Sequence, residues 1–228
     1  MKKITLTILL LLALLSCSQP DSVTPDSSIT VSPNGTATNE WLIPQSKVFD
    51  GGPGIDGIPS VDQPKFEHPD HPAHDYLNDD SRVLVYRSDN IIKAYPHPIL
   101  DWHEIVNDQI GEDSIALTYC PLTGTGIGWG RIINGNRTTF GVSGLLYESN
   151  LMPYDRSTNS TWSQLFNQCV NGALIRTAPP FFNFVEINFA ALKKLYPQAQ
   201  GLQIPVLTAT TKIILTVTTL PVTILFFQ

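Results

Sequence analysis

Cys120 is the residue of this chain whose type and setting best suit chemistry, because it is the reactive side chain in the run Thr-Tyr-Cys-Pro-Leu-Thr-Gly-Thr at residues 118–125. A strand-like apolar stretch, residues 114–119, leads to it, and the proline and glycine that follow favour a turn. A thiol reacts as its thiolate, which hydroxyl and backbone N–H donors stabilise. The run therefore predicts a solvent-facing thiol at a corner, with Thr123 stabilising the thiolate.

The same run has the spacing of a redox motif. Cys120-Pro121-Leu122-Thr123 follows the Cys-x-x-Cys pattern with threonine in place of the second cysteine. A resolving thiol would have to come from Cys169 or from a protein partner. Two other interpretations stay open: Cys120 is a buried cysteine that ends a strand, or it forms a disulfide with Cys169.

His103 is the predicted base for this thiol, because a nucleophilic thiol commonly needs an imidazole that a third group orients. Asp155 or Asp101 is expected to orient the ring. If residues 104–110 pair with residues 114–119 as a hairpin, His103 and Cys120 lie at the same end of one ladder. The alternatives are that His103 caps a turn, or that Cys120 and His103 together bind a metal ion.

Substrate contacts are predicted just after the thiol and beside Asp155. Glycine recurs at every second position from Gly124 to Gly130. In a strand this pattern leaves one face of the backbone without side chains, so that a ligand can approach closely. Gly124 and Thr125 are therefore candidate contacts. Arg156 is either a clamp for an anionic group or one half of an ion pair, and no cofactor is expected.

The histidines of residues 68–74 invite a metal interpretation. His68 and His71 both precede proline. Proline favours extended backbone before it, in which imidazoles three residues apart stand about 9 Å from each other. That separation is too large to share one ion unless the chain turns tightly. A solvated loop is expected here, and no metal site is predicted.

The first residues predict export from the cytoplasm. Lys2 and Lys3, an apolar stretch over residues 4–15 and a small-residue boundary before Cys17 are the signs of a signal peptide over residues 1–16. The Leu-Leu-Ser-Cys ending resembles the bacterial lipobox, which implies that lipid on Cys17 anchors the protein to the cell envelope, facing the periplasm or the exterior. An ordinary signal peptide with an incidental cysteine is the alternative.

Composition divides the rest of the chain into three parts. Residues 17–46 are rich in Ser, Thr, Pro and Asn and predict a flexible stalk that begins at the lipidated cysteine. Residues 47–200 are enough for a single globular domain. Residues 201–228 are atypical, with Lys212 as their one charged residue, and are interpreted as a disordered or frameshifted tail. The net charge of −6 and the pI near 5.2 argue against a nucleic-acid partner.

Short apolar runs between turn signals predict the fold class. Residues 82–87 and 91–95 form one expected hairpin, residues 104–110 and 114–119 a second, and Asn134-Gly135 marks a third. Residues 185–195 have convincing helical periodicity, with Pro197 closing the helix, and residues 99–103 are expected to form a turn of helix. The expected class is α+β, mainly antiparallel β hairpins with one C-terminal helix.

Four sequence blocks together resemble one known family. They are residues 56–62 with 64–66, residues 94–96 with 99–108, residues 118–126, and residues 140–150 with 154–156 and 162–164. Over residues 54–200 the chain is similar to domain-of-unknown-function family 3179, found in bacterial and archaeal envelope proteins. The resemblance implies an envelope domain for which no reaction is established, and it favours a functional role for Cys120. After Gln200 the chain departs from the family pattern.

The favoured hypothesis is a lipid-anchored envelope protein with a thiol-dependent site, either redox or nucleophilic. Its expected partners are membrane lipid, through Cys17, and a thiol redox partner. A non-catalytic binding or scaffold lipoprotein is the second hypothesis, and a metal-binding domain is the third. The site residues of the favoured hypothesis are Cys120, His103, Thr123 and Asp155 as catalytic groups and Arg156, Gly124 and Thr125 as substrate contacts.

Overall fold

The structure, a computed structural model of the chain, describes residues 40–204. All of these residues belong to the compact unit that begins at Thr36. The predicted signal peptide, the lipidated Cys17, most of the stalk and the tail from residue 205 on lie outside the described residues. Among residues 40–204, no helix is both long enough and apolar enough to cross a membrane.

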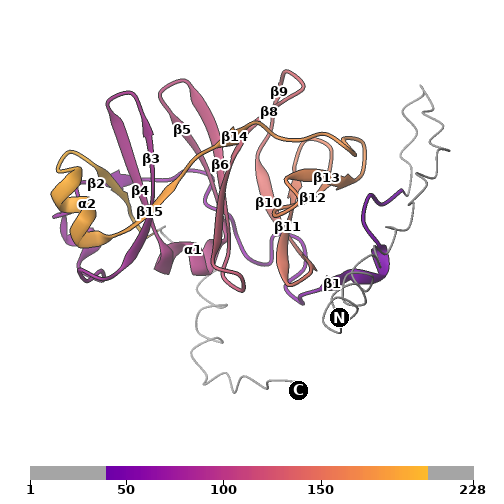
Figure 1. The fold of residues 1–228 in the computed structure, drawn as a ribbon, viewed down its shortest axis with the longest axis horizontal. Helices are drawn as coiled ribbons and strands as arrows, with labels where there is room; N and C mark the ends of the chain where they lie inside the picture. The colour runs from indigo at the N-terminus through magenta and orange to yellow at the C-terminus, as the bar shows by residue number, and fades with distance from the viewer. Residues whose placement is uncertain (1–39, 205–228) are drawn as a thin grey trace, which may run out of the picture. The chain divides into compact units, whose positions relative to one another are not determined.

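Residues 40–204 form sixteen strands, two short α-helices and two 3-10 helices (Figure 1). In chain order the elements are η1 (Gln45–Lys47), β1 (Val48–Asp50), β2 (Phe66–Glu67), η2 (Pro72–His74), β3 (Arg82–Ser88), β4 (Ile91–Pro96), α1 (His97–His103), β5 (Ile105–Ile110), β6 (Asp113–Cys120), β7 (Thr125–Gly130), β8 (Ile132–Ile133), β9 (Asn136–Arg137), β10 (Phe140–Tyr147), β11 (Asn150–Asp155), β12 (Thr161–Ser163), β13 (Gln168–Asn171), β14 (Phe181–Phe182), β15 (Val185–Asn188), α2 (Phe189–Leu195) and β16 (Gln200–Leu202).

Three sheets hold most of these strands. The first sheet has the order β1-β10-β11-β12-β13, the second β14-β7-β6-β5 and the third β15-β3-β4-β16-β2, while β8 and β9 form a separate ribbon. Neighbouring strands run antiparallel, except that β16 pairs in parallel with β4. The prediction of a mainly antiparallel β domain is therefore confirmed, and so are its hairpins β3–β4, β5–β6 and β8–β9.

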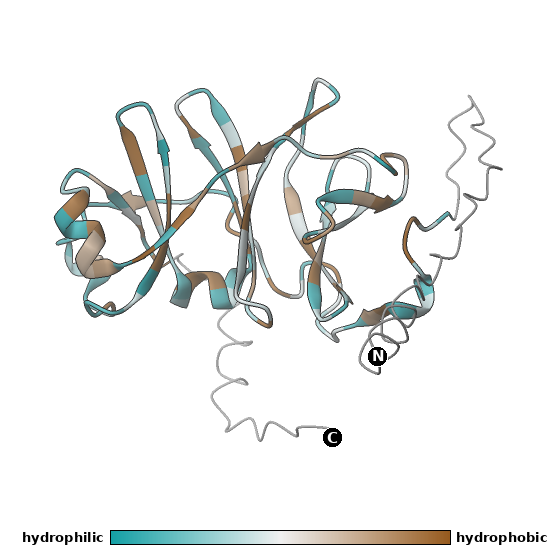
Figure 2. Cartoon of the chain, in the orientation of Figure 1, coloured by the Kyte–Doolittle hydropathy of each residue, from teal (hydrophilic) through white to brown (hydrophobic). Residues whose placement is uncertain are grey.

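The second sheet lies between the other two, which explains its sequence. One face of β6 carries Leu117 and Tyr119, which pack with Tyr95 and other residues of the third sheet. The opposite face carries Ala116 and Cys120, which pack with residues of the first sheet. A strand covered on both faces reads as a continuous apolar run. In Figure 2 the turns of the β3–β4 and β5–β6 hairpins are teal, while brown residues lie along the strands.

The predicted helix over residues 185–195 is wrong in its first third. Val185 to Asn188 form β15, which pairs with β3 in the register Val185↔Val85. The α-helix α2 begins only at Phe189, because the Asn188 side chain accepts a hydrogen bond from the Ala191 amide and caps it. Pairing with an exposed sheet edge has overridden the helical periodicity of these residues. The expected turn of helix at residues 99–103 is part of a regular helix, α1.

The start of the predicted atypical tail belongs to the third sheet. Gly201 and Leu202 lie in β16, and the Leu202 side chain is fully buried. Gly201 pairs with Ala94 on one side and with Glu67 on the other. These two residues therefore hold β2 against the sheet.

Candidate functional site

A cleft of about 280 Å³ opens where α1 and the β6–β7 turn meet the first sheet. Its walls come from the segment before β2, from the end of α1, from the β6–β7 turn and from β10 and β11. The lining residues are Gly51, Pro53, Ile58, Asp101, Glu104, Pro121, Leu122, Val142, Gly144, Leu145, Leu146 and Leu151. Its two carboxyl groups are the only ionisable side chains in an otherwise apolar lining.

Glu104 is the unusual residue of this cleft. It links α1 to β5 with φ 55° and ψ −31°, a backbone conformation that is unfavourable for any residue with a β-carbon. Hydrogen bonds hold its backbone on both sides: its N–H donates to Leu100 O at 2.8 Å, and its C=O accepts from the Tyr119 N–H at 2.6 Å. The surrounding structure therefore imposes this conformation on Glu104.

Burial raises the pKa of the Glu104 carboxyl to about 7, and burial is the sole cause. No ion pair within residues 40–204 includes this carboxyl. Asp101 lies one turn earlier on α1, and burial also raises its pKa, although His97 and the Tyr119 hydroxyl act in the opposite direction. The cleft thus holds two carboxyl groups that gain protons more readily than carboxyl groups in water.

The expected solvent exposure of Cys120 is wrong. Cys120 is the last residue of β6 and is only 1 % exposed. Strand alternation directs its side chain to the face that packs with Trp129 and Phe140, and its Sγ contacts Ser149 O at 3.8 Å. The two residues that follow, Pro121 and Leu122, line the cleft, but Cys120 does not.

The second cysteine of the domain is also a buried free thiol. Cys169 belongs to the same apolar cluster as Cys120, and its Sγ donates to Asn171 O at 3.3 Å. Burial raises the pKa of Cys169 to about 12. The disulfide considered between Cys120 and Cys169 is not formed in this structure.

The residues after the thiol are engaged with the protein itself. Thr123 Oγ1 accepts a hydrogen bond from Asn150 Nδ2 at 3.1 Å, and the Thr123 N–H donates to Cys120 O at 3.3 Å. Thr125 Oγ1 donates to Thr123 O. Gly124 has φ 61°, and a β-carbon there would meet no atom within 4 Å, so it turns the chain beside open space. These contacts make a compact turn, and the predicted roles in catalysis and substrate contact stay predictions.

His103 contacts another part of the chain. Its ring is 7 % exposed, and Nδ1 lies 2.7 Å from Pro59 O, which identifies Nδ1 as the protonated nitrogen. Burial lowers the pKa of His103, so the neutral ring is favoured. No hydrogen bond within residues 40–204 joins His103 to Cys120 or to Asp155. In this structure, His103 attaches α1 to the segment over residues 53–62, which precedes β2.

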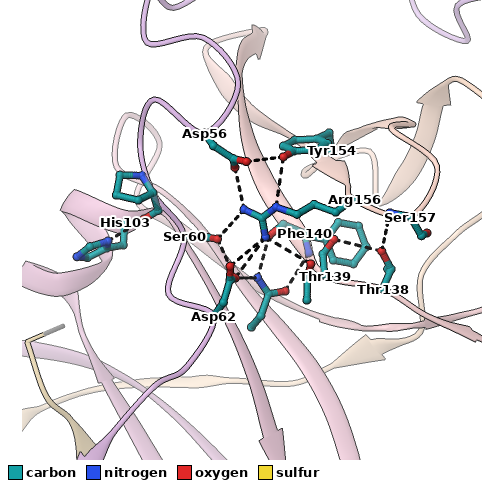
Figure 3. Close-up of polar contacts among 12 residues, drawn as sticks. Asp56, Ser60, Asp62, His103, Thr138, Thr139, Phe140, Tyr154, Arg156 and Ser157 are labelled. Carbon is teal, nitrogen blue, oxygen red and sulfur yellow. Dashed lines mark hydrogen bonds and ion pairs between the residues drawn. The ribbon is translucent and has the colours of Figure 1, made fainter. Parts of the chain in front are cut away.

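Arg156 fixes the same segment (Figure 3). Its guanidinium lies between Asp56 and Asp62, with Nη2 to Asp56 Oδ1 at 2.8 Å and Nη1 to Asp62 Oδ2 at 3.2 Å. Nη2 also donates to Ser60 Oγ at 3.0 Å, and Nε donates to the Tyr154 hydroxyl at 3.3 Å. Of the two roles considered for Arg156, the ion pair is therefore the one this geometry contains.

Asp155 faces away from Arg156 and is fully buried. Its carboxylate accepts hydrogen bonds from Ser157 and Thr158 in the β11–β12 connection and from the Trp162 indole in β12. The structure thus uses Asp155 to hold a turn, whereas sequence reasoning assigned it to orienting His103.

The histidine-rich loop is tied to its neighbours one residue at a time. His68 Nε2 lies 2.8 Å from Pro197 O, His71 Nδ1 accepts from the Ala73 amide, and His74 Nδ1 lies 3.1 Å from His68 O. Across residues 40–204, no group of three or more His, Cys, Asp or Glu side chains is placed to hold a metal ion.

Sequence reasoning missed Glu104 and treated Asp101 only as a partner of His103. The available signal was a charged residue at the junction between a predicted turn of helix and the apolar run that starts at Ile105. Charged residues at such junctions are common on protein surfaces, so this signal is weak. The burial that raises the Glu104 pKa comes from segments far away in the sequence.

One protein family is similar to this chain over most of its length. The model of the family described as a protein of unknown function (DUF3179) matches residues 55–212. No curated protein and no solved structure matches the chain. The matched span contains the Arg156 ion pairs, Cys120 and every lining residue of the cleft except Gly51 and Pro53.

Proposed function

Since the chain belongs to the DUF3179 family of proteins of unknown function, we propose a function from the geometry of its cleft: the domain binds a small ligand there and exchanges a proton with it through Glu104. The observation that carries this proposal is a carboxyl of pKa about 7 lining an apolar cleft. A group that gives and takes protons works best when its pKa lies near the ambient pH. Glu104 meets this condition at neutral pH.

The backbone of Glu104 supports the same proposal. Unfavourable φ and ψ values at a residue other than glycine cost about 1–3 kcal/mol and are concentrated at functional sites. Glu104 combines φ 55° with a desolvated carboxyl, so two unfavourable features coincide at one residue. Asp101, on the same wall, is a second proton-binding group for the ligand.

The Glu104 titration tests this proposal directly. The side-chain carboxyl carbon of Glu104 is followed by ¹³C NMR from pH 3 to 9, and the Glu104→Gln variant assigns the signal. A midpoint near 7 is expected, as against the ordinary value of 4.5. A midpoint near the ordinary value would show that the carboxyl is not prepared for proton exchange and would overturn the proposal.

A thiol-dependent function is the second candidate, favoured by the position of Cys120 directly before two residues of the cleft wall. The thiol is 1 % exposed, so this candidate requires a movement of the turn at residues 121–124 that exposes the sulfur. In this candidate Cys120 acts as a nucleophile or as a redox thiol, with the second thiol supplied by a partner protein.

Alkylation separates this candidate from an inert buried thiol. Cys169 is the internal control, because burial raises its pKa to about 12 and it should react only when the domain unfolds. Cys120 is expected to react with iodoacetamide at least tenfold faster than Cys169, as measured on their separate peptides by mass spectrometry. Equal rates for the two thiols would exclude the thiol-dependent function and leave Cys120 as a core residue.

The setting proposed for this domain is the bacterial cell envelope, facing the periplasm or the exterior, with lipid on Cys17 as the anchor. A non-catalytic binding lipoprotein remains the alternative in this setting. This alternative predicts that ligands bind in the cleft, that Glu104 titrates near its ordinary pKa of 4.5, and that Cys120 reacts no faster than Cys169.

A further inference from the structure

The only ionisable side chains that line the cleft are acidic. Asp101 and Glu104 are its only ionisable side chains, and the remaining lining residues are glycine, proline, isoleucine, leucine and valine. No lysine, arginine or histidine lines the cleft. A ligand that fills it therefore meets apolar walls and two carboxyl groups.

The Glu104 carboxyl lacks the partner that a half-buried acid normally has. Of the nine ion pairs within residues 40–204, none includes Asp101 or Glu104. By contrast, Asp56 and Asp62, on the segment before β2, share Arg156 although both side chains are exposed. A desolvated carboxylate without a cation is unfavourable, and a cation delivered by a ligand removes this cost.

We propose that the ligand of the cleft is a small amine: a cationic nitrogen that pairs with Glu104 and Asp101, joined to a short apolar chain that packs against Ile58, Leu122, Leu146 and Leu151. This inference rests on the proposed function, because it names the class of ligand for the same cleft. An anionic ligand would be repelled by both carboxylates in a site of low dielectric constant. A volume of about 280 Å³ lies at the lower limit of ligand pockets, so the chain is short.

Binding of such an amine should become stronger as the pH rises. Glu104 ionises as the pH rises through about 7, whereas an alkylamine keeps its charge to a pH near 10. Burial is the only cause of the Glu104 pKa shift, so no titratable group on a neighbouring element contributes to it. These groups include His97, Asp101 and His103 on α1, Tyr119 and Cys120 on β6, and Asp56 on the segment before β2. Affinity for an amine should therefore rise between pH 6 and pH 8.

Three probes of equal chain length test the inference: n-hexylamine, n-hexanol and n-hexanoate. Each is titrated into ¹⁵N-labelled protein at pH 6 and pH 8, and the amide shifts of residues 104, 122 and 144 report on the cleft. At pH 8 hexylamine is expected to bind about tenfold more tightly than hexanol, and hexanoate more weakly than either. The Glu104→Gln variant should lose about tenfold in hexylamine affinity and keep its hexanol affinity.

The control variant is Glu112→Gln, which removes the same charge from the exposed β5–β6 turn and should leave all three affinities unchanged. If Glu104→Gln disturbs the fold, which its ¹⁵N spectrum reveals, Asp101→Asn provides the second variant, with a smaller loss of hexylamine affinity. Equal binding of hexylamine and hexanol would overturn the amine inference and leave the proposed ligand cleft intact. Failure of all three probes to shift cleft residues would count against the cleft as a ligand site as well.

Discussion

At Glu104, backbone strain and side-chain desolvation are imposed on the same residue. The strain follows from the change of direction between α1 and β5, and the desolvation follows from burial of the carboxyl in the folded domain. Both features persist because hydrogen bonds to Leu100 and Tyr119 determine the backbone position. Glutamine keeps the size of the side chain without its charge, so this substitution separates the cost of burying the charge from the cost of the strain.

Replacing Glu104 by glutamine is expected to change how stability depends on pH. The folded pKa of about 7 exceeds the ordinary 4.5, so between these values the folded state binds more protons than the unfolded state. The free energy of unfolding of the wild type therefore falls as the pH rises from 4.5 to 7. The free energy of unfolding of Glu104→Gln does not fall in this way, because glutamine does not ionise. The variant should therefore be more stable than the wild type by about 1–3 kcal/mol above pH 7.

Urea unfolding at pH 4.5, 5.5, 7 and 8 measures this difference, which should be small at the lowest pH and largest at the highest. Glu112→Gln, in the exposed turn, should follow the wild type throughout. A constant offset between Glu104→Gln and the wild type at all four pH values would mean that the carboxyl titrates alike in the folded and unfolded states, contrary to this prediction.

Among the structural elements, the segment over residues 53–62 depends most on a single side chain. It forms one wall of the cleft with Pro53 and Ile58, and it has no regular secondary structure of its own. Three backbone hydrogen bonds attach it to the sheets: Asp56 N to Val142 O, Val61 N to Ile105 O, and Asn107 N to Val61 O. The side-chain contacts are the Arg156 ion pairs, the contact between His103 and Pro59, and hydrogen bonds from Asn107 to Asp62 and from Tyr154 to Asp56.

Removal of the Arg156 charge should loosen this segment. Arg156→Gln leaves the Asp56 and Asp62 carboxylates without their shared cation, and because both are exposed the expected cost is about 0.5–1 kcal/mol of unfolding free energy. Hydrogen exchange should accelerate at the amides of residues 56 and 61. Lys47→Gln, which breaks the exposed pair between Lys47 and Glu148, is the control and should change neither quantity. Unchanged exchange in Arg156→Gln would assign the attachment to the backbone bonds alone.

The packing of β16 against the histidine-rich loop makes a second prediction for an element. A β-carbon on Gly201 would lie 2.8 Å from the Nε2 atom of His74, which is itself 2 % exposed. Gly201→Ala should therefore destabilise the domain by about 1–3 kcal/mol through overpacking. In the double variant with His74→Ala the two costs should be less than additive, as measured by urea unfolding. Strict additivity of the two free-energy changes would mean that an alanine at position 201 does not clash sterically with His74.

For the whole molecule, the sheets form a series of layers with the cleft at one boundary. One apolar cluster joins the first sheet to the second, another joins the second to the third, and a further cluster joins the third sheet to α2. The cleft lies at the boundary between the first two sheets, where α1 ends and the β6–β7 turn begins. Residues 51 to 151 contribute to it, so the site depends on the assembly of both sheets.

Attachment to a membrane is the prediction that concerns the complete chain. If Cys17 carries lipid, the wild type expressed in a bacterium should be found in the membrane fraction and should partition into detergent, because acyl chains contribute about 0.8 kcal/mol per buried methylene. Cys17→Ser should move the protein to the soluble fraction or leave its signal peptide uncleaved, as read by mass spectrometry. Ser27→Ala, in the predicted stalk, is the control. An unchanged distribution of Cys17→Ser would exclude the lipid anchor.

The sequence by itself determined the features that depend on neighbouring residues. Short apolar runs and the turn signals at Asp89 and Asn134 predicted the antiparallel hairpins, and both residues have positive φ as tight turns require. The sequence blocks that resemble the family lie within the span that its model matches. Periodicity failed at Val185, because a strand edge that becomes available only after folding competes with a helix there.

Only the tertiary structure decided which side chains form a site. Cys120 lies in the expected strand and turn, yet its exposure depends on Phe140 and Trp162 in another sheet. Glu104 is unremarkable in sequence, yet walls drawn from residues 51 to 151 raise its pKa to about 7. Strand and turn preferences arise from interactions over a few residues, whereas burial and pKa depend on groups that are far apart in sequence and meet only in the folded domain.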